Sequence, residues 1–113
     1  MLTRALFAEN SRAEVPIVGL VSQGERVSGQ VDRLAVTEAQ VLIADYKSDR
    51  LVPRRAEDVS QTYVRQLALY RAVLQRLYPN HQVRAALVWT AGPTLMELPA
   101  ALLDAALSRL SAA

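Results

Sequence analysis

The sequence is 113 residues long, a length that suits one domain and leaves no room for a second. Apolar residues make up 51% of it and charged residues 21%, which excludes disordered, collagen-like and coiled-coil proteins. The net charge of +2 is too small for the whole surface to attract a polyanion, so any contact with nucleic acid must be local. Because cysteine is absent, disulfides, thiolate zinc sites, iron–sulfur clusters and cysteine nucleophiles are excluded.

The first half of the chain predicts three strands. Residues 13–21 are rich in β-branched side chains, and Pro16 suits a strand start or an edge strand. Residues 26–36 alternate imperfectly between apolar and polar side chains, and residues 40–47 follow after a short polar step. Short connections favour antiparallel pairing of successive strands, so we expect a three-stranded meander.

A helix is predicted after a loop at residues 49–57. It spans residues 58–78, with Asp58 or Ser60 as its N-cap. Its apolar stripe, at helical spacings, consists of Tyr63, Leu67, Tyr70, Leu74 and Leu77.

Two strands and a helix complete the chain. The strands are expected at residues 82–91 and 94–98, and the alanine-rich helix at residues 99–110. The elements therefore follow the order βββαββα, without internal repeats. This order is typical of an α/β fold.

Asp45 and Lys47 are the first candidates for a functional site. They lie two residues apart in a predicted strand, so their side chains leave the same face of the sheet. The flanking Val41, Ile43 and Tyr46 favour a sheet covered on both sides, where a carboxylate and an ammonium need each other, a metal or a substrate. For an isolated pair, a structural ion pair is the commoner meaning, by roughly two to one.

Asp32 adds a second carboxylate. A short turn at residues 36–40 would bring it alongside Asp45, although alone it could equally be a turn residue. Two facing carboxylates repel each other, and with the backbone carbonyl of Tyr46 they form an oxygen-only site that suits Mg²⁺, or Mn²⁺ as its substitute. Beside such an ion, Lys47 could act on an attacking water and on charge that develops on a phosphate. This combination predicts phosphodiester hydrolysis.

Three blocks of the sequence resemble the signature motifs of the RecB-like branch of the PD-(D/E)XK nucleases. They are GQVDRL at residues 29–34, IADYKS at residues 43–48 and QLALY at residues 66–70. Residues 13–16 also resemble the first strand of that branch, so the likeness covers essentially the whole chain. It is strongest to the C-terminal nuclease domain of AddA-type helicase–nuclease subunits. The resemblance implies a restriction-endonuclease-like α/β fold, a mixed central sheet flanked by helices, and a magnesium-dependent deoxyribonuclease.

The resemblance also implies roles for individual residues. Asp32 and Asp45 would bind the metal, and Lys47 would be the catalytic lysine. Gln66 and Tyr70 would approach the site and the DNA, although either could merely close the helix–sheet interface. Relatives that carry an iron–sulfur cluster hold it through cysteines, so this chain resembles the cluster-free members.

Four other residues are candidates with more ordinary explanations. Glu14 could face the metal, but a charge at a strand edge is the commoner meaning of such a residue. Arg50, Arg54 and Arg55 could contact phosphates next to the site, but a solvated loop is commoner. We also expect Tyr63 and Trp89 to lie in the core and His81, the only histidine, to lie in a surface loop.

The upstream end departs from the family pattern. Members of the branch commonly carry a metal-binding histidine on a helix before the first strand, and His81 does not match it. We therefore expect residues 1–113 to be one RecB-like nuclease domain, a C-terminal fragment of a larger helicase–nuclease that lacks most of its upstream helix. Such a fragment would cleave DNA weakly or not at all and would self-associate, with exchange of residues 2–9 as one route.

The resemblance implies that the whole protein is an ATP-driven exonuclease of DNA double-strand-break repair, with DNA and a partner subunit as its partners. No apolar run reaches the roughly 18 residues of a membrane span, so we expect a cytoplasmic protein. Two rival interpretations remain open. One is an inactive nuclease-like module that binds DNA or a partner. The other is a glycosidase with paired carboxylates, which the aromatic content of 5% disfavours.

Overall fold

The structure is a computed structural model that describes residues 11–21, 26–92 and 94–111, so residues 2–9 lie outside it. The described residues form a five-stranded sheet. Its strands are β1 (Arg12–Leu20), β2 (Arg26–Val36), β3 (Gln40–Lys47), β4 (Gln82–Trp89) and β5 (Thr94–Leu98). The helices are α2 (Gln61–Leu77) and α3 (Ala100–Ser111), and the predicted loop contains one 3₁₀ turn, η2 (Ala56–Asp58).

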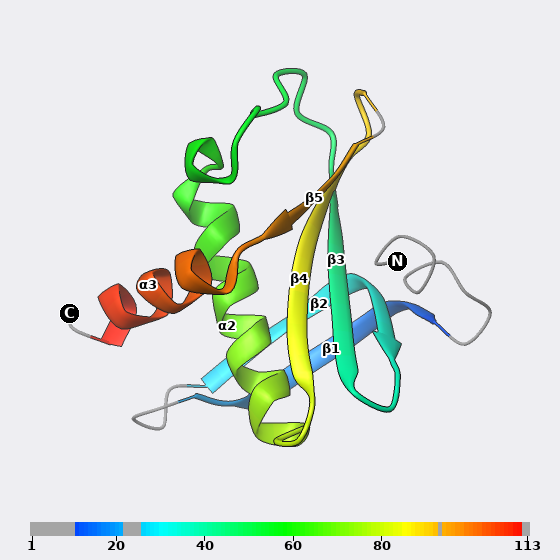
Figure 1. The fold of residues 1–113 in the computed structure, drawn as a ribbon, viewed down its shortest axis with the longest axis vertical. Helices are drawn as coiled ribbons and strands as arrows, with labels where there is room; N and C mark the ends of the chain where they lie inside the picture. Colours follow the sequence, from blue (N-terminus) through cyan, green and yellow to red (C-terminus); the bar gives the residue numbers. More distant parts are fainter. Residues whose placement is uncertain (1–10, 22–25, 93, 112–113) are drawn as a thin grey trace.

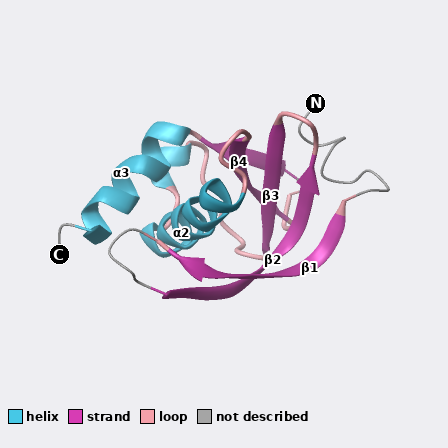
Figure 2. Cartoon of the chain, turned by 90° about the horizontal axis from the view of Figure 1, so that it is seen from below, coloured by secondary structure: helices cyan, strands magenta, loops and turns pink. Residues whose placement is uncertain are grey.

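The sheet is mixed, as the sequence predicts. Its strand order is β1-β2-β3-β4-β5, and only β3 and β4 are parallel. A parallel pair needs a crossover connection, and α2 supplies it between β3 and β4. Both helices lie on the same face of the sheet (Figures 1 and 2). The fold is therefore α/β and agrees with the restriction-endonuclease-like architecture.

The main core lies between this face and α2. Leu67 and Val73 of α2 and Trp89 of β4 are among its buried members, and full burial of each such side chain contributes about 1.5 to 3 kcal/mol. A smaller cluster of Ala35, Leu42 and Ala44 occupies the opposite face. The buried position of Trp89 confirms the expectation for that residue.

The long helix begins after the second of its two predicted N-caps, so the predicted start at residue 58 is wrong whereas Ser60 is right. Asp58 ends η2, and α2 begins at Gln61. Ser60 occupies the N-cap position but makes no side-chain capping bond, and its backbone carbonyl accepts hydrogen bonds from the Tyr63 and Val64 amides. The N-cap position therefore followed from the sequence, but the capping interaction did not.

Two other expectations need correction. Leu77, placed in the apolar stripe, is 64% exposed, because the last turn of α2 lies beside the edge strand β1, next to Val18 and Leu20. His81 lies in the loop before β4, as expected, but it is half-buried rather than fully exposed, and its Nε2 lies 3.0 Å from the Thr37 carbonyl oxygen. Neither described helix is long and apolar enough to span a membrane.

The strand β2 changes partners along its length, and this change creates the site. From Arg26 to Leu34 it pairs with β1, whereas it pairs with β3 only from Arg33 to Val36. Val31 and Leu34 both pack on the core beneath α2. In a regular strand, side chains alternate between the two faces, so residues three positions apart would lie on opposite faces. The strand therefore twists between them, and the β1–β2 pair diverges from β3 (Figure 1). Pairing of β2 with β3 begins at Arg33, so the two strands separate at Asp32.

Candidate active site

Asp32 and Asp45 lie together where β2 separates from β3. Their register positions face each other one step beyond the last pair, Arg33 with Ala44. The backbone amide of Asp32 donates to Asp45 Oδ1 at 3.0 Å, and the amide of Tyr46 donates to Asp32 Oδ2 at 2.8 Å. The two carboxylates thus replace the ladder bonds that the diverging strands can no longer make. This confirms the expected juxtaposition of the two aspartates.

Asp45 is the only charged residue in the described part of the chain that is fully buried, with 4% of its surface exposed. Burial raises the pKa of its carboxyl, and the negative charge of Asp32 raises it further. The backbone hydrogen bond from Asp32 and the positive charge of Lys47 oppose this rise in the pKa without cancelling it. The site therefore holds a negative charge at a cost that a bound cation would remove.

Lys47 does not form the structural ion pair that the sequence left open as an alternative. Within residues 11–21, 26–92 and 94–111, no ion pair joins it to Asp45. Its Nζ lies 3.5 Å from Gln66 Oε1 and 4.2 Å from the centroid of the Tyr63 ring. Both neighbours are neutral, so the ammonium is positioned without its charge being neutralised.

Gln66 and Tyr70 of α2 connect this lysine to β2. Gln66 Nε2 donates to the Tyr70 hydroxyl at 3.4 Å. Tyr70 is 6% exposed and rests on Gly29, where an added Cβ would overlap its hydroxyl oxygen and lie 2.8 Å from Cζ. Only glycine allows this close approach. The helix block and the glycine of the first strand block are therefore complementary parts of one contact.

Sequence reasoning missed the part that Tyr63 and Asp49 play. Tyr63 was expected in the core, but it is half-buried, and its hydroxyl donates to the Asp49 carboxylate at 2.9 and 3.1 Å. Its ring centroid lies 4.2 Å from Lys47 Nζ and 6.1 Å from the Trp89 ring centroid. The available signal was position, because Tyr63 precedes Gln66 by three residues on the helix.

Glu14, on β1, lies opposite Asp32 of β2, at the one register position between Arg12 and Leu20 that the β1–β2 pairing skips. Its φ of 54° lies in the left-handed region that few non-glycine residues adopt, and its side chain is exposed. In the part of the chain that the structure describes, no three His, Cys, Asp or Glu residues form a metal-binding group. Glu14 is therefore near the aspartates in register but is not gathered with them.

The three arginines of the loop are all exposed. Arg55 is bonded within the loop, since its Nε donates to Glu57 Oε2 at 2.8 Å. Arg50 and Arg54 make no ion pair with any residue in the described ranges. Two of the three predicted phosphate contacts thus remain available, whereas the third arginine already has a carboxylate partner.

The donor set of this site suits a hard divalent ion. Each hydrogen bond from a backbone amide uses one oxygen of its carboxylate, which leaves Asp32 Oδ1 and Asp45 Oδ2 as ligands of the kind that Mg²⁺ prefers. The raised pKa of Asp45 shows that its negative charge is unfavourable in the protein alone, and a bound cation would stabilise that charge. With only two carboxylates gathered, a backbone carbonyl and waters would have to complete the coordination.

Comparison with known proteins defines the class. A family model described as the PD-(D/E)XK nuclease superfamily matches residues 2–108, and the chain belongs to that superfamily. Superfamily members are in general phosphodiester-cleaving nucleases that use divalent metals, so a metal-dependent nuclease is indicated.

Among solved structures, the crystal structure of SSO0001 is similar, with a TM-score of 0.51 and 14% identity. The alignment covers 91% of this chain and 50% of that one, so the present chain spans about half the length of the similar structure. At this identity the likeness concerns the fold alone. A search of curated proteins found no match.

Proposed function

We propose that this domain is a magnesium-dependent deoxyribonuclease of the RecB-like branch. The observation that carries the proposal is the reciprocal bonding of Asp32 and Asp45 where β2 leaves β3, with Lys47 projecting from the same face. A site made only for stability would match its charges, whereas this one gathers two carboxylates and a lysine that forms no ion pair with any residue the structure describes.

Each residue has a defined part in the proposed reaction. Asp32, Asp45 and the carbonyl of Tyr46 would hold the ion. When bound, Mg²⁺ supplies charge stabilisation on a phosphate and lowers the pKa of a water. The backbone amides of Asp32 and Tyr46 fix the two carboxylates before any ligand arrives. The Lys47 ammonium would donate a hydrogen bond and supply positive charge to the reacting phosphate, and Gln66 Oε1 accepts from it and holds it in place.

The finer assignment rests on the three sequence blocks. We propose an exonuclease that processes broken DNA ends as the nuclease domain of an AddA-type helicase–nuclease, with DNA and a partner subunit as its partners. Contact between Gly29 of the first block and Tyr70 of the third supports treating the blocks as one unit. Gln66 accepts a hydrogen bond from Lys47 and donates one to the Tyr70 hydroxyl. Its position beside the proposed catalytic lysine supports its proposed role near the DNA.

Metal binding and cleavage should be measured on the same variants. Mn²⁺ binding, followed by electron paramagnetic resonance, should be lost or at least about tenfold weaker in Asp32→Asn and Asp45→Asn, because each loses one anionic ligand. Asp58→Asn is the matched control, since Asp58 is exposed and lies outside the site. Magnesium-dependent cleavage of end-labelled DNA should disappear with the same two variants and persist in the control. Unchanged Mn²⁺ affinity in both site variants would refute the metal assignment.

The rival module would give a different pattern. Wild-type protein that binds Mn²⁺ and DNA but never cuts, even at high enzyme concentration, would identify a binding domain. Retention of all three of Asp32, Asp45 and Lys47 favours the enzyme, because a module without catalytic duties does not require their combination.

A further inference from the structure

The two edges of the sheet differ in how well they are protected against pairing with another chain. The edge strand β5 has five residues and carries the charged Glu97, and both its short length and its charge discourage such pairing. The other edge strand, β1, has nine residues. Glu14, with its left-handed φ of 54°, interrupts the regular strand, and residues 15–20 after it carry no charge. The second half of β1 is therefore the less protected edge.

The side chains of this second half divide between a buried face and an exposed one. Ile17 lies in the main core, and an added Cβ on Gly19 would lie 2.7 Å from Val73 Cγ1, so both residues face α2. Alternation along the strand turns Val18 and Leu20 to the opposite face. There Val18 is 53% exposed and Leu20 is 52% exposed. Two large apolar side chains thus stand side by side in solvent at the sheet edge.

The end of α2 supplies a second apolar surface at the same edge. Leu77 is largely exposed, and it lines a hollow of about 330 Å³ together with residues 18–20. Arg76 lies in the wall of this hollow, and its Nη1 donates to the Leu20 carbonyl oxygen at 2.8 Å. A strand added to this edge would therefore meet apolar side chains on both of its faces.

The backbone of the edge has a specific pattern of donors and acceptors. The N–H and C=O groups of alternate residues in a strand point to the same edge. Pro16 has no N–H, so its nitrogen belongs on the edge that points away from β2, and the backbone groups of Val18 and Leu20 share that direction. The bond from Arg76 to the Leu20 carbonyl agrees with this direction. The edge therefore offers the Pro16 carbonyl, the amide and carbonyl of Val18, and the Leu20 amide.

We propose that this edge pairs with the same edge of a second copy of the chain, in antiparallel orientation, with the two-fold axis at Val18. Each Val18 amide then donates to the Val18 carbonyl of the other copy, and each Leu20 amide donates to the opposite Pro16 carbonyl. Pro16 has no hydrogen to give to the Leu20 carbonyl opposite it, but Arg76 already supplies a donor to that carbonyl. The missing donor and the occupied acceptor thus face each other.

This match is what selects a second copy over an unrelated strand. An ordinary residue opposite Leu20 would direct its amide at a carbonyl that Arg76 already engages, and an ordinary residue opposite Pro16 would find no donor for its own carbonyl. The edge of β1 avoids both defects when it pairs with itself. On the exposed face, the pairing also brings Val18 against Val18 and Pro16 against Leu20, which are apolar contacts throughout.

The resulting dimer is closed and symmetric, because the same patch serves both copies. The two-fold axis is perpendicular to the sheet, so the α2 helices of both copies lie on one face of a continuous sheet. Leu77 of each copy then covers the added strand. The contact is small, so we expect a weak, reversible dimer. It does not depend on the proposed nuclease function.

Charges placed on the two-fold axis test this arrangement. In Val18→Lys and in Val18→Glu, like charges would face each other across the axis, so each variant should dimerise at least about tenfold more weakly than wild type. An equimolar mixture of the two variants should recover the affinity, since opposite charges then meet. Sedimentation equilibrium at about 10 μM to 1 mM protein measures all four samples, a range that suits weak contacts.

A matched control separates this effect from a general effect of charge. Gln30→Lys adds the same charge at an exposed position of the neighbouring strand, opposite Pro16, and should dimerise like wild type. Circular dichroism checks that each variant is folded. Amide hydrogen exchange gives a second readout: the Val18 and Leu20 amides should exchange more slowly as the protein concentration rises, whereas the Ile17 and Gly19 amides, which point toward β2, should not change.

The dimer is supported if both Val18 variants are weak alone, strong when mixed, and different from the control. A wild-type protein that stays monomeric over the whole concentration range would overturn it. A mixture no stronger than its components, or an equal loss in Gln30→Lys, would also overturn it, because neither result is compatible with Val18 on a two-fold axis. Concentration-dependent protection of amides elsewhere but not of Val18 and Leu20 would place the contact on another surface and refute the proposal.

Discussion

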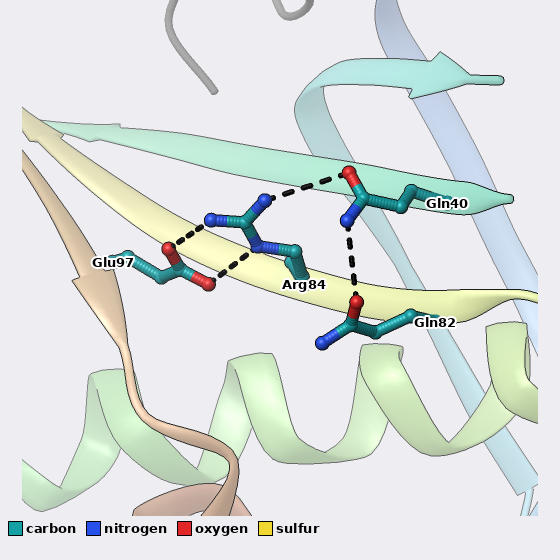
Figure 3. A network of polar contacts seen from close by, with 4 residues as sticks. All are labelled: Gln40, Gln82, Arg84 and Glu97. Carbon is teal, nitrogen blue, oxygen red and sulfur yellow. Dashed lines mark hydrogen bonds and ion pairs between the residues drawn. The ribbon is translucent and has the colours of Figure 1, made fainter. Parts of the chain in front are cut away.

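The sheet carries one polar cluster on each face, and the two differ in how their charges are matched. On the face away from α2, Arg84 of β4 meets Glu97 of β5 through two hydrogen bonds, of 2.7 and 2.5 Å (Figure 3). Gln40 accepts from Arg84 at 3.4 Å and donates to Gln82 at 3.2 Å. Contact with Arg84 holds the pKa of Glu97 below its usual value, and Glu97 raises the pKa of Arg84. This cluster is complete without any ligand.

The cluster under α2 has the opposite character. Asp45 is buried with a raised pKa, and Asp32 adds a second negative charge beside it. Their hydrogen-bond donors are backbone amides, and Lys47 rests on the neutral Gln66 and Tyr63. Opposite charges that pair within the protein stabilise each other, whereas carboxylates without such a partner can still bind a cation. The contrast within one sheet separates a structural network from a candidate site more clearly than either cluster does alone.

The largest expected difference between the clusters is in catalysis. Lys47→Ala should slow single-turnover DNA cleavage by about two to four orders of magnitude, because in the proposed reaction the ammonium acts on the reacting phosphate. Mn²⁺ affinity should change little, since Lys47 is not a ligand. Arg84→Gln is the control on the other face and should cleave at the wild-type rate. Normal cleavage by Lys47→Ala would reduce the lysine to a surface cation.

The second prediction concerns stability and the matched cluster. Glu97→Gln should lower the free energy of unfolding by on the order of 1 kcal/mol, since it removes the anion from a half-buried ion pair. A carboxyl with a lowered folded pKa stabilises the protein above its usual titration range, and this contribution disappears as the pH falls through the lowered value. The deficit of Glu97→Gln relative to wild type should therefore shrink in acid. Urea denaturation at a series of pH values measures it, and a deficit that is independent of pH would contradict it.

For the cluster of Asp32, Asp45 and Lys47, removal of a charge should raise the free energy of unfolding rather than lower it. Asp45→Asn should raise the free energy of unfolding in EDTA by somewhat under 1 kcal/mol, because asparagine keeps the acceptor for the Asp32 amide and removes the buried charge. A carboxyl with a raised folded pKa favours the folded state at low pH, and that benefit is lost as the pH rises through the raised value. The gain from Asp45→Asn should therefore be largest at neutral pH and should vanish in acid. Saturating Mg²⁺ should reverse the order by stabilising only the wild type. Loss of stability in EDTA at neutral pH would show that the charge is well matched after all.

The sequence predicts where Asp32, Asp45 and Lys47 lie better than it predicts the residues that support them. Alternation along residues 43–47 is enough to place Asp45 and Lys47 on one face, and a short turn is enough to bring Asp32 to them. No residue pattern near Asp32 predicts that β2 separates from β3 there. The separation depends on the direction that β2 takes once it pairs with β1 alone, which is a property of the whole sheet. The role of Tyr63 was missed for a similar reason: an aromatic residue at helical spacing indicates a core position, and only the fold shows the lysine beside it.

The smallest predicted effect concerns the link between Tyr63 and Lys47, and it can be resolved because the chain contains a single lysine. Protein labelled with ¹³C-lysine should give one set of side-chain resonances, shifted upfield by the ring that lies 4.2 Å from Nζ. Tyr63→Leu should abolish the shift and lower the cleavage rate severalfold, because the ammonium loses one of its two neutral supports. Tyr63→Phe keeps the ring and loses only the bond to Asp49, so it should retain most of the shift and rescue most of the rate. A lysine spectrum that is the same in wild type and Tyr63→Leu would place the ammonium away from the ring and remove Tyr63 from the site. If the shift disappears and the rate does not change, Gln66 alone suffices to position Lys47. Cleavage would then depend on the hydrogen bond from Lys47 to the Gln66 amide and not on the Tyr63 ring.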